Sequence, residues 1–189
     1  MGNVYTKRYI RRYMFKIVEK KLLAENIYRL RVEAPRVAHS ALPGQFVIVR
    51  TDEHGERVPL TIADYDTSAG TVTIVIQAIG MSTRKMCALN EGDALADLAG
   101  PLGNPSEFVN VPMDELRRRR YLFVAGGVGT APVYPQVKWL HEHGVAVDVI
   151  IGAKTSSMLI YKDEMGRVAD NLYICLLYTS PSPRDRSLS

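Results

Sequence analysis

Short segments that mix hydrophobic and polar residues at strand-like spacing fill the first half of the chain. The clearest alternation lies at residues 71–77, where Val72, Ile74 and Ile76 recur at every second position. Clusters of Gly, Pro, Asn and Asp separate the segments, so the pattern predicts a small antiparallel β-barrel or sandwich. The segments expected to form strands are 15–23, 27–33, 46–50, 58–63, 71–77 and 94–98, with one short helix at 82–88.

The pattern changes after residue 120, where continuous apolar runs alternate with amphipathic segments. Strand, helix, strand, helix and strand in succession predict an α/β unit whose strands pair in parallel through right-handed crossovers. Gly144 stands where a glycine ends a helix, directly after the first amphipathic segment. The expected strands are 121–125, 145–151 and a third that begins at 172, and the expected helices are 131–143 and 157–168.

A segment rich in Gly and Pro at residues 100–105, followed by a charged connector, separates the two halves. We expect a β-barrel domain over residues 14–105, a connector over 106–120 and a parallel-sheet α/β domain over 121–175. We also expect the second domain to be truncated after its third strand. Residues 1–13 form a basic leader, and Met14 is a candidate for the native start.

The C-terminal residues do not continue the third strand of the α/β unit in a sensible way. The string LLYTSPSPRD at residues 176–185 resembles the conceptual translation of a transposase sequencing-library adapter. We therefore expect the native reading to end at about Cys175 and residues 176–189 to be foreign. The alternative is a genuine tail rich in Pro and Ser, and resequencing the locus from unfragmented DNA distinguishes the two.

The composition, 47% hydrophobic and 23% charged residues, is that of a folded chain. Two cysteines exclude a disulfide scaffold, cannot alone ligate a metal centre, and indicate a reducing compartment. No run approaches the ~20 apolar residues of a membrane span, and no signal peptide is present, so we expect a cytoplasmic protein without a membrane partner. The basic clusters at residues 7–12 and 117–120 lack interleaved aromatic residues, so we expect no nucleic-acid binding.

The strongest chemical signal is the sequence VAGGVGTAPV at residues 124–133. Glycines after a buried strand allow a tight turn, and the helix that follows directs its free N–H groups and dipole at a phosphate. The sequence lacks the G-x-G-x-x-G fingerprint, so an ordinary dinucleotide-binding dehydrogenase is a poorer match. The alternative is a packing turn without a ligand. The candidate nucleotide-binding residues are Gly126, Gly127, Val128, Gly129, Thr130, Ala131 and Pro132.

A β-barrel half followed by an α/β half with GGVGTAP resembles the ferredoxin–NADP reductase superfamily from Met14 to about Cys175. The segments PGQFV, RVPLTIAD, QAIGMST, GPLGNP and APVYP are similar to one branch of it. That branch contains the small subunit of NADH-dependent ferredoxin–NADP oxidoreductase (sulfide dehydrogenase) and the electron-transfer subunit of dihydroorotate dehydrogenase. The segment RVPLTIAD is closer to the former.

The resemblance implies that the barrel binds FAD and that the second half binds NAD(P)H. Thr61 is the catalytic candidate, because a hydroxyl there can hydrogen-bond flavin N5 or O4. The wider superfamily often has Arg-x-Tyr-Ser on this strand; here Leu60 replaces the aromatic residue, and Arg57 lies one residue early. A phosphate-binding arginine and a charged hairpin flank are therefore both open for Arg57. The assigned residues are Pro59, Leu60 and Thr61 along the flavin, Ile76, Gln77 and Ala78 beside the nucleotide, and Gly80, Ser82 and Thr83 at the FAD pyrophosphate.

The resemblance also implies an assembly. Family members carry a C-terminal cysteine cluster for a [2Fe–2S] centre, which we expect in the full-length protein but which this chain lacks. The implied partner is a larger flavoprotein or iron–sulfur subunit, either glutamate-synthase-like or the dihydroorotate dehydrogenase catalytic subunit, and ferredoxin is a possible acceptor. We expect the 189-residue chain alone to be inactive. A non-catalytic FAD- or nucleotide-binding module is the remaining alternative.

Overall fold

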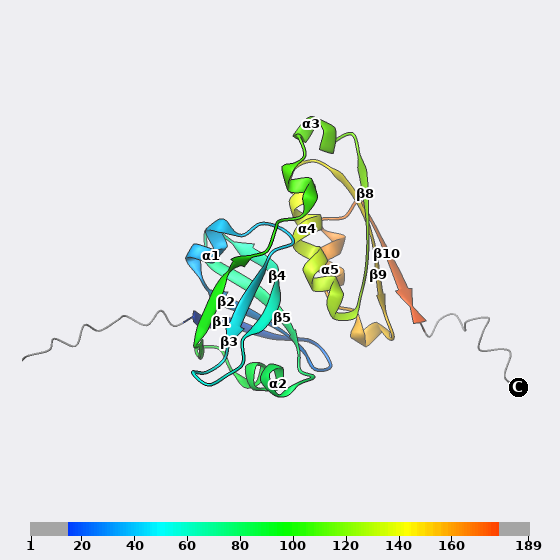
Figure 1. Ribbon diagram of the computed structural model, residues 1–189. Helices are drawn as coiled ribbons and strands as arrows, with labels where there is room; N and C mark the ends of the chain where they lie inside the picture. The colour runs from blue at the N-terminus through cyan, green and yellow to red at the C-terminus, as the bar shows by residue number, and fades with distance from the viewer. Residues whose placement is uncertain (1–14, 178–189) are drawn as a thin grey trace, which may run out of the picture.

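The computed structural model describes residues 15–177, and its first unit is the antiparallel β-barrel that the alternation predicts (Figure 1). Seven strands lie in the order β6-β1-β2-β5-β4-β3-β7. Only Ala96 separates β6 from β7, so one nearly continuous segment pairs with β1 at one edge and with β3 at the other, which closes the sheet. The bounds are β1 Phe15–Ala24, β2 Ile27–Glu33, β3 Phe46–Arg50, β4 Val58–Asp66, β5 Thr71–Gln77, β6 Ala94–Leu95 and β7 Asp97–Leu102, with helices α1 Pro35–Ser40 and α2 Met81–Ala88.

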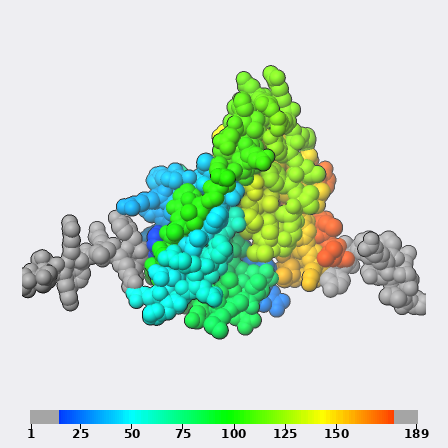
Figure 2. Space-filling view, in the orientation of Figure 1, coloured from blue at the N-terminus to red at the C-terminus, as the bar shows by residue number. Residues whose placement is uncertain are grey.

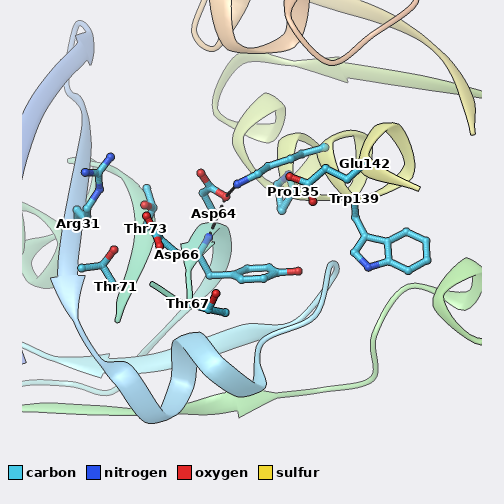
Figure 3. Close-up of a pocket in the computed structure, with 11 residues that line it drawn as sticks. Arg31, Asp64, Asp66, Thr67, Thr71, Thr73, Pro135, Trp139 and Glu142 are labelled. Atoms are coloured by element: carbon cyan, nitrogen blue, oxygen red, sulfur yellow. Dashed lines mark hydrogen bonds and ion pairs between the residues drawn. The ribbon is translucent and has the colours of Figure 1, made fainter. Parts of the chain in front are cut away.

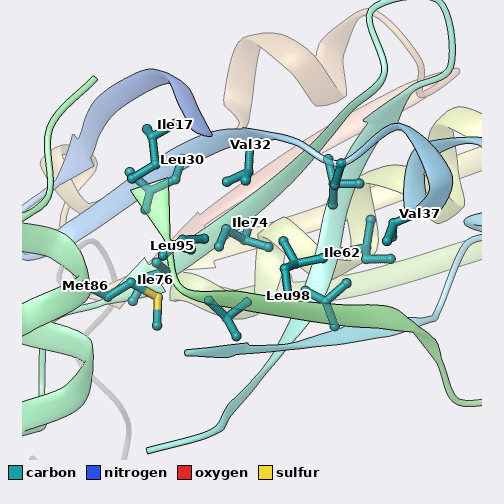
Figure 4. Packing of buried hydrophobic residues seen from close by; sticks show 14 of the residues in the cluster. Ile17, Leu30, Val32, Val37, Ile62, Ile74, Ile76, Met86, Leu95 and Leu98 are labelled. Atoms are coloured by element: carbon teal, nitrogen blue, oxygen red, sulfur yellow. The ribbon is translucent and has the colours of Figure 1, made fainter. Parts of the chain in front are cut away.

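The barrel interior is filled by alternate residues of its strands, most of them branched aliphatics (Figure 4). On β5, Val72, Ile74 and Ile76 point inward and are almost fully buried, as the period of two requires. Met86 of α2 covers one end of the barrel core and is completely buried. The outward residues of β5 are buried as well, and one of them, Val75, packs in the hydrophobic cluster of the second unit.

The second unit is a three-stranded parallel sheet in the order β10-β9-β8, which confirms the expected α/β class. Helix α4 ends as predicted: Gly144 has φ +72°, its N–H donates to the carbonyl of His141, and the N–H of Val145 donates to that of Leu140. The bounds are β8 Arg120–Gly126, β9 Ala146–Ala153, β10 Asn171–Leu176, α4 Thr130–Glu142 and α5 Lys162–Gly166. A 3₁₀ turn, Glu107–Asn110, and helix α3, Met113–Leu116, form the connector.

The helix expected over residues 157–168 is wrong. The structure has a 3₁₀ turn at Ser156–Met158 and then the short helix α5. Tyr161 interrupts any longer helix, because its φ of +59° is left-handed and its ring is buried against Tyr134 at 5.1 Å between centroids. Local pattern also missed α1, which Pro35 begins directly after the strand expected at 27–33.

The two units share one hydrophobic cluster. Helices α4 and α5 lie between the parallel sheet and the barrel (Figure 1), and the units meet along a continuous seam (Figure 2). The cluster of the second unit includes four barrel residues that point out of the barrel, namely Ala24, Ile27, Ala63 and Val75. The seam is therefore a packed core, and it fixes the second unit against strands β4 and β5.

A β-bulge in β4 determines what faces this seam. Ile62 pairs with Ile74, but Asp64 pairs with Thr73, so two steps on β4 match one step on β5. Ile62 joins the barrel core, and Ala63 joins the shared cluster. The extra residue lets Asp64 point outward together with Ala63, where strict alternation would turn it inward.

The face of the parallel sheet that points away from α4 and α5 is open within residues 15–177. Leu122, Val124 and Tyr173 lie on it, each more than half exposed. No helix in this range is long and apolar enough to cross a membrane. The expected leader, 1–13, lies outside the described residues, as does the expected foreign tail except for Leu176, the last residue of β10, and Leu177.

We predict that Leu140→Ala lowers the free energy of unfolding by about 2–5 kcal/mol, because Leu140 is fully buried in the shared cluster and its removal leaves a cavity. The matched control Leu122→Ala, on a residue that is 61% exposed, should change it by less than about 0.5 kcal/mol. Urea unfolding followed by circular dichroism measures both, and equal losses would contradict the assignment of the core.

Candidate functional site

A cavity of about 480 Å³ lies where the carboxyl ends of the parallel strands face the barrel. Ligands of open α/β sheets bind at this end of the strands. Gly126 ends β8, Gly152 lies near the end of β9, and Cys175 lies near the end of β10, so all three strands contribute. Ile27 and Gln77 enter from the barrel. The remaining lining residues are Gly127, Val128, Ala153, Lys154, Met158 and Leu177.

The glycine turn has the open backbone that the sequence predicts. Gly127 has φ +55°, and a Cβ placed there would meet no atom within 4 Å. Gly129 is equally open, and a Cβ at Gly126 would lie 3.5 Å from the carbonyl oxygen of Gly152. A 3₁₀ turn, Gly127–Gly129, leads directly into α4, so the first N–H groups of the helix belong to this turn. A phosphate group therefore fits the space and the donors of this site.

The next three candidates contribute differently. Thr130 and Ala131 are 2% and 1% exposed, and Ala131 packs in the shared cluster. Neither these two nor Pro132 lines the cavity. Their contribution to the site is to start α4 at the glycine turn. Most of the cavity residues that sequence reasoning missed lie at or just beyond the ends of β9 and β10. The rule that ligands of open α/β sheets bind at the carboxyl ends of the strands could have pointed to them. The missed residues are Ile27, Gly152, Ala153, Lys154, Met158, Cys175 and Leu177.

The three candidates on β4 lie on two faces of the barrel wall. Pro59 and Thr61 are exposed on the outer face, opposite Ile48 and Phe46 of β3. Leu60 pairs with the fully buried Val47 and packs against the barrel core. The outer face thus presents the ring of Pro59 and the hydroxyl of Thr61, while Leu60 presents only its backbone.

The candidates at the end of β5 are similarly divided. Ile76 is 1% exposed in the barrel core, and the N–H of Ala78 donates to the carbonyl of Asn26 at 2.8 Å. Gln77 alone of the three lines the cavity, where it faces the glycine turn of the second unit. The structure therefore brings Gln77 together with Gly126, Gly127 and Val128, which the sequence places about 50 residues away.

Helix α2 begins at the third group of candidates. The Thr83 hydroxyl accepts a hydrogen bond from the Gly80 N–H at 3.0 Å and lies 3.1 Å from its carbonyl, which caps the helix. The Ser82 hydroxyl donates to the carboxylate of Glu56, in the loop before β4. Both hydroxyls are engaged within the protein, and a negative charge lies beside the first turn of the helix. Backbone N–H groups are the donors that this turn has to spare.

No family model matches the sequence. An uncharacterised Clostridium beijerinckii protein from the "adh 3′ region" is 58% identical over 161 residues, which are 85% of this chain and 54% of that protein. A Thermotoga maritima homologue of the dihydroorotate dehydrogenase B (NAD⁺) electron-transfer subunit is 39% identical over 84% of this chain and 54% of its own length. The structure of NADH-dependent reduced ferredoxin–NADP oxidoreductase, a flavin-based electron-bifurcating enzyme, matches with a TM-score of 0.76 at 38% identity, over 85% of this chain and 56% of that one. The chain shares the fold of ferredoxin–NADP reductases.

The chain spans about half the length of the curated relatives it matches. Its β-barrel and parallel sheet are those of the ferredoxin–NADP reductase fold. The branch identified from the sequence segments is also the branch of these relatives, electron-transfer subunits of dihydroorotate dehydrogenase B and the NADH-dependent ferredoxin–NADP oxidoreductase.

Two departures from the wider superfamily have structural counterparts. Arg57 forms an ion pair with Asp97 at 3.1 Å, and its side chain is more than half exposed. Leu60 replaces a residue type that can stack on a flavin, and it turns toward the barrel core instead. Leu60 is therefore part of the hydrophobic packing of the barrel, at a position where the wider superfamily often has an aromatic residue.

Cys87 is a core residue: it is 6% exposed, and burial raises the pKa of its thiol. His143 stacks on Trp139 at 3.8 Å, while His141 is exposed, so the two histidines do not face a common ligand. Over residues 15–177, no cluster of His, Cys, Asp and Glu could hold a metal ion.

We predict opposite effects for two substitutions in the glycine turn. Gly127→Ala should lower the free energy of unfolding by roughly 1–2 kcal/mol, because its φ of +55° is left-handed. Gly129→Ala should raise the free energy of unfolding by about 0.4–1 kcal/mol. Alanine adopts the φ of −65° found at Gly129 without strain, and it has fewer conformations than glycine in the unfolded chain. Neither new Cβ meets an atom within 4 Å, so backbone conformation alone separates the two. Thermal unfolding of both variants measures the difference; the same sign for both would show that the turn differs from this structure.

Proposed function

We propose that the chain is the FAD- and NAD(P)H-binding part of an electron-transfer subunit of the NADH-dependent ferredoxin–NADP oxidoreductase type. The observation that carries the proposal is the cavity in which Gln77 of the barrel faces Gly126–Val128 at the strand ends. A nucleotide bound at the glycine turn would lie directly against the barrel. The 38% identity to the bifurcating oxidoreductase over 85% of the chain supports it.

The NAD(P)H pyrophosphate would be held by the turn Gly127–Gly129 and the N-terminus of α4. The open space above Gly127 and Gly129 is a cradle that side chains would fill, which is why glycine suits both positions. Thr130, Ala131 and Pro132 would act through the helix they begin. The mostly apolar lining, including Val128 and Met158, suits a nicotinamide or adenine ring.

FAD would lie along the outer face of β4 and at the N-terminus of α2. Pro59 and Thr61 present a flat, exposed surface there, and Leu60 offers its backbone. Gln77 would flank the ring, with Ile76 and Ala78 holding it from the barrel. Gly80, Ser82 and Thr83 would bind the pyrophosphate, with Ser82 leaving Glu56 when the phosphate arrives.

FAD, when bound, supplies the chemistry: it takes a hydride from the nicotinamide and releases electrons singly. The protein contributes position and polarity. The Thr61 hydroxyl would hydrogen-bond the flavin and tune its reduction potential. The apolar cavity would exclude water from the reacting face.

For the full-length protein we propose a [2Fe–2S] centre, as the family resemblance implies. The two cysteines of this chain cannot supply its ligands. Electrons would pass through it to a larger flavoprotein or iron–sulfur subunit, in the cytoplasm. The isolated 189-residue chain, whose sheet is open on one face, would be inactive.

A second candidate is the electron-transfer subunit of dihydroorotate dehydrogenase B. It is favoured by the relatives of that name, at 39% identity in Thermotoga maritima and 27–33% in other bacteria. The genes beside this one separate the two functions: a pyrimidine-synthesis enzyme supports the second candidate, and a large glutamate-synthase-like subunit supports the first.

We predict that the full-length protein from the complete gene is purified yellow and that NADH or NADPH bleaches its flavin absorbance under anaerobic conditions. A nucleotide held at the glycine turn meets the barrel face, so reduction should need no partner subunit. Protein that stays colourless after reconstitution with FAD would refute the proposal. Protein that binds FAD but is not bleached by either nucleotide would instead be a non-catalytic binding module.

We predict that Glu56→Gln tightens FAD binding about fivefold, which corresponds to roughly 1 kcal/mol of repulsion between charges ~4 Å apart in water. The carboxylate bonds Ser82 at the proposed pyrophosphate site, and the amide removes its charge. Glu53→Gln makes the same charge change in the same loop and serves as the control. Flavin fluorescence titration measures both dissociation constants. Equal tightening in the two variants would indicate a general charge effect and no pyrophosphate beside Ser82.

A further inference from the structure

A second cavity, of about 300 Å³, lies between the barrel and helix α4 (Figure 3). Its barrel side consists of polar residues of β2, β4 and β5, and its helix side includes Pro135, Trp139 and Glu142. At this place α4 is separated from the sheet by open space. Packing alone therefore does not hold this part of the helix.

One ion pair crosses the edge of this cavity. Lys138 Nζ of α4 donates to Asp64 Oδ1 of β4 at 2.8 Å, and the same oxygen accepts the N–H of Tyr65 at 2.9 Å. Both side chains are 30% exposed. Burial by itself would lower the pKa of Lys138, but the hydrogen bond and charge of Asp64 outweigh it and raise the pKa, so Lys138 is charged at neutral pH. Two oriented donors thus fix the direction of the carboxylate.

The bulge in β4 is what aims Asp64 at the helix. Strict alternation after Ile62 would turn residue 64 into the barrel, whereas the bulge pairs it with Thr73 on the outer face. A charged residue at the inward position would be buried among aliphatic side chains. The bulge therefore directs the Asp64 carboxylate toward Lys138.

The pair links strand β4, the proposed flavin strand, to helix α4, which follows the glycine turn. Asp64 lies three residues after Thr61 on the strand assigned to the flavin. Lys138 lies on the helix whose N-terminus forms the glycine turn. A rotation or shift of α4 relative to β4 changes the position of the turn relative to Thr61.

The apolar part of the seam does not set this relation alone. Ala63 and Val75 join β4 and β5 to the shared cluster, but hydrophobic contacts have no preferred direction, whereas the ion pair joins one atom of α4 to one atom of β4. The Arg29–Glu164 pair, at 3.3 Å, attaches α5 to the barrel, and Ser106 with Gln136, at 2.9 Å, attaches α4 to the connector. Within residues 15–177, the ion pair that joins α4 to β4 is the one between Lys138 and Asp64.

We propose that Asp64 and Lys138 are a positioning pair that sets helix α4, and with it the glycine turn, at the height over β4 needed for hydride transfer. The proposal rests on the proposed function. It assigns these residues no contact with either cofactor, so their effect should fall on the rate of transfer and spare the binding of FAD and NADH.

The first test uses the full-length protein loaded with FAD. Lys138→Met should slow the limiting rate of flavin reduction by NADH at least tenfold, with the FAD dissociation constant and the half-saturating NADH concentration changed less than threefold. Misplacement of reactants by ~1 Å is enough for a loss of this size. The long-wavelength absorbance of the stacked nicotinamide and flavin should weaken in parallel. Lys138→Arg keeps the charge and should recover most of both signals.

The control is Arg120→Met. Arg120 forms a two-bond ion pair with Asp148, at 2.7 and 2.8 Å, at the amino ends of β8 and β9, remote from the glycine turn. If the two Met variants slow reduction equally, ion pairs contribute only general stability and the proposal fails. It fails as well if Lys138→Met reduces flavin at the parent rate.

The second test needs no cofactor and uses the 189-residue chain. Spin labels at Lys85→Cys on α2 and His141→Cys on α4, with Cys175→Ser, report the distance between the units; both positions are exposed, and Cys87 is buried. Pulsed electron–electron double resonance should give one narrow distance distribution in the labelled parent protein. Lys138→Met should broaden or shift this distribution, and Arg120→Met should leave it unchanged. An unaltered distribution in Lys138→Met overturns the positioning role. If the full-length parent takes up no FAD, the proposed function fails, and this measurement alone decides the pair.

Discussion

The rest of the structure depends on the contact between the outward residues of β4 and β5 and helix α4. A barrel wall ordinarily has one buried and one wet face, but Thr71, Thr73 and Val75 are buried on the outer face of β5. Ala63 and Val75 belong to the same cluster as the core of the parallel sheet. This contact converts two small units into one body and sets the strand ends against Gln77. Without it, the cavity would have only one wall.

Local rules predicted the elements that local interactions determine. The alternation of β5 and the glycine that ends α4 depend on neighbours within a few residues, so pattern was sufficient. The helix expected at 157–168 was wrong because Tyr161 adopts a left-handed conformation to bury its ring against Tyr134, a partner 27 residues away. The end of β4 was also misjudged, since pattern placed it at residue 63. The bulge carries the strand on to Asp66, and its register is visible only in pairing with β5.

The candidate site divides in the same way. Positive φ at Gly127 and a helix start just after it are properties of a few consecutive residues, and GGVGTAP states them. Which candidates point at the cavity depends on where the strands lie in the fold. Leu60 and Ile76 point into the barrel, whereas Lys154 and Cys175 line the cavity. The residues around Lys154 and Cys175 in the chain do not indicate which other parts of the fold lie beside them. Family resemblance assigned candidates to strands but could not choose between the two faces of each strand.

The closing segment of the barrel has a consequence for synthesis. The strands β6 and β7, at residues 94–102, pair with β1 and β3. During synthesis, about 70 further residues must follow β1 before β6 can pair with its free edge. Until then, β1 is an unpaired sheet edge of the kind that recruits other chains. The outward strip of Ala63 and Val75 waits longer still, for α4 at 130–142. A nascent chain on the ribosome therefore passes through two aggregation-prone intermediates in a fixed order, the first with a free β1 edge and the second with an exposed apolar strip. The rate of translation between residues 24 and 142 governs how long each persists.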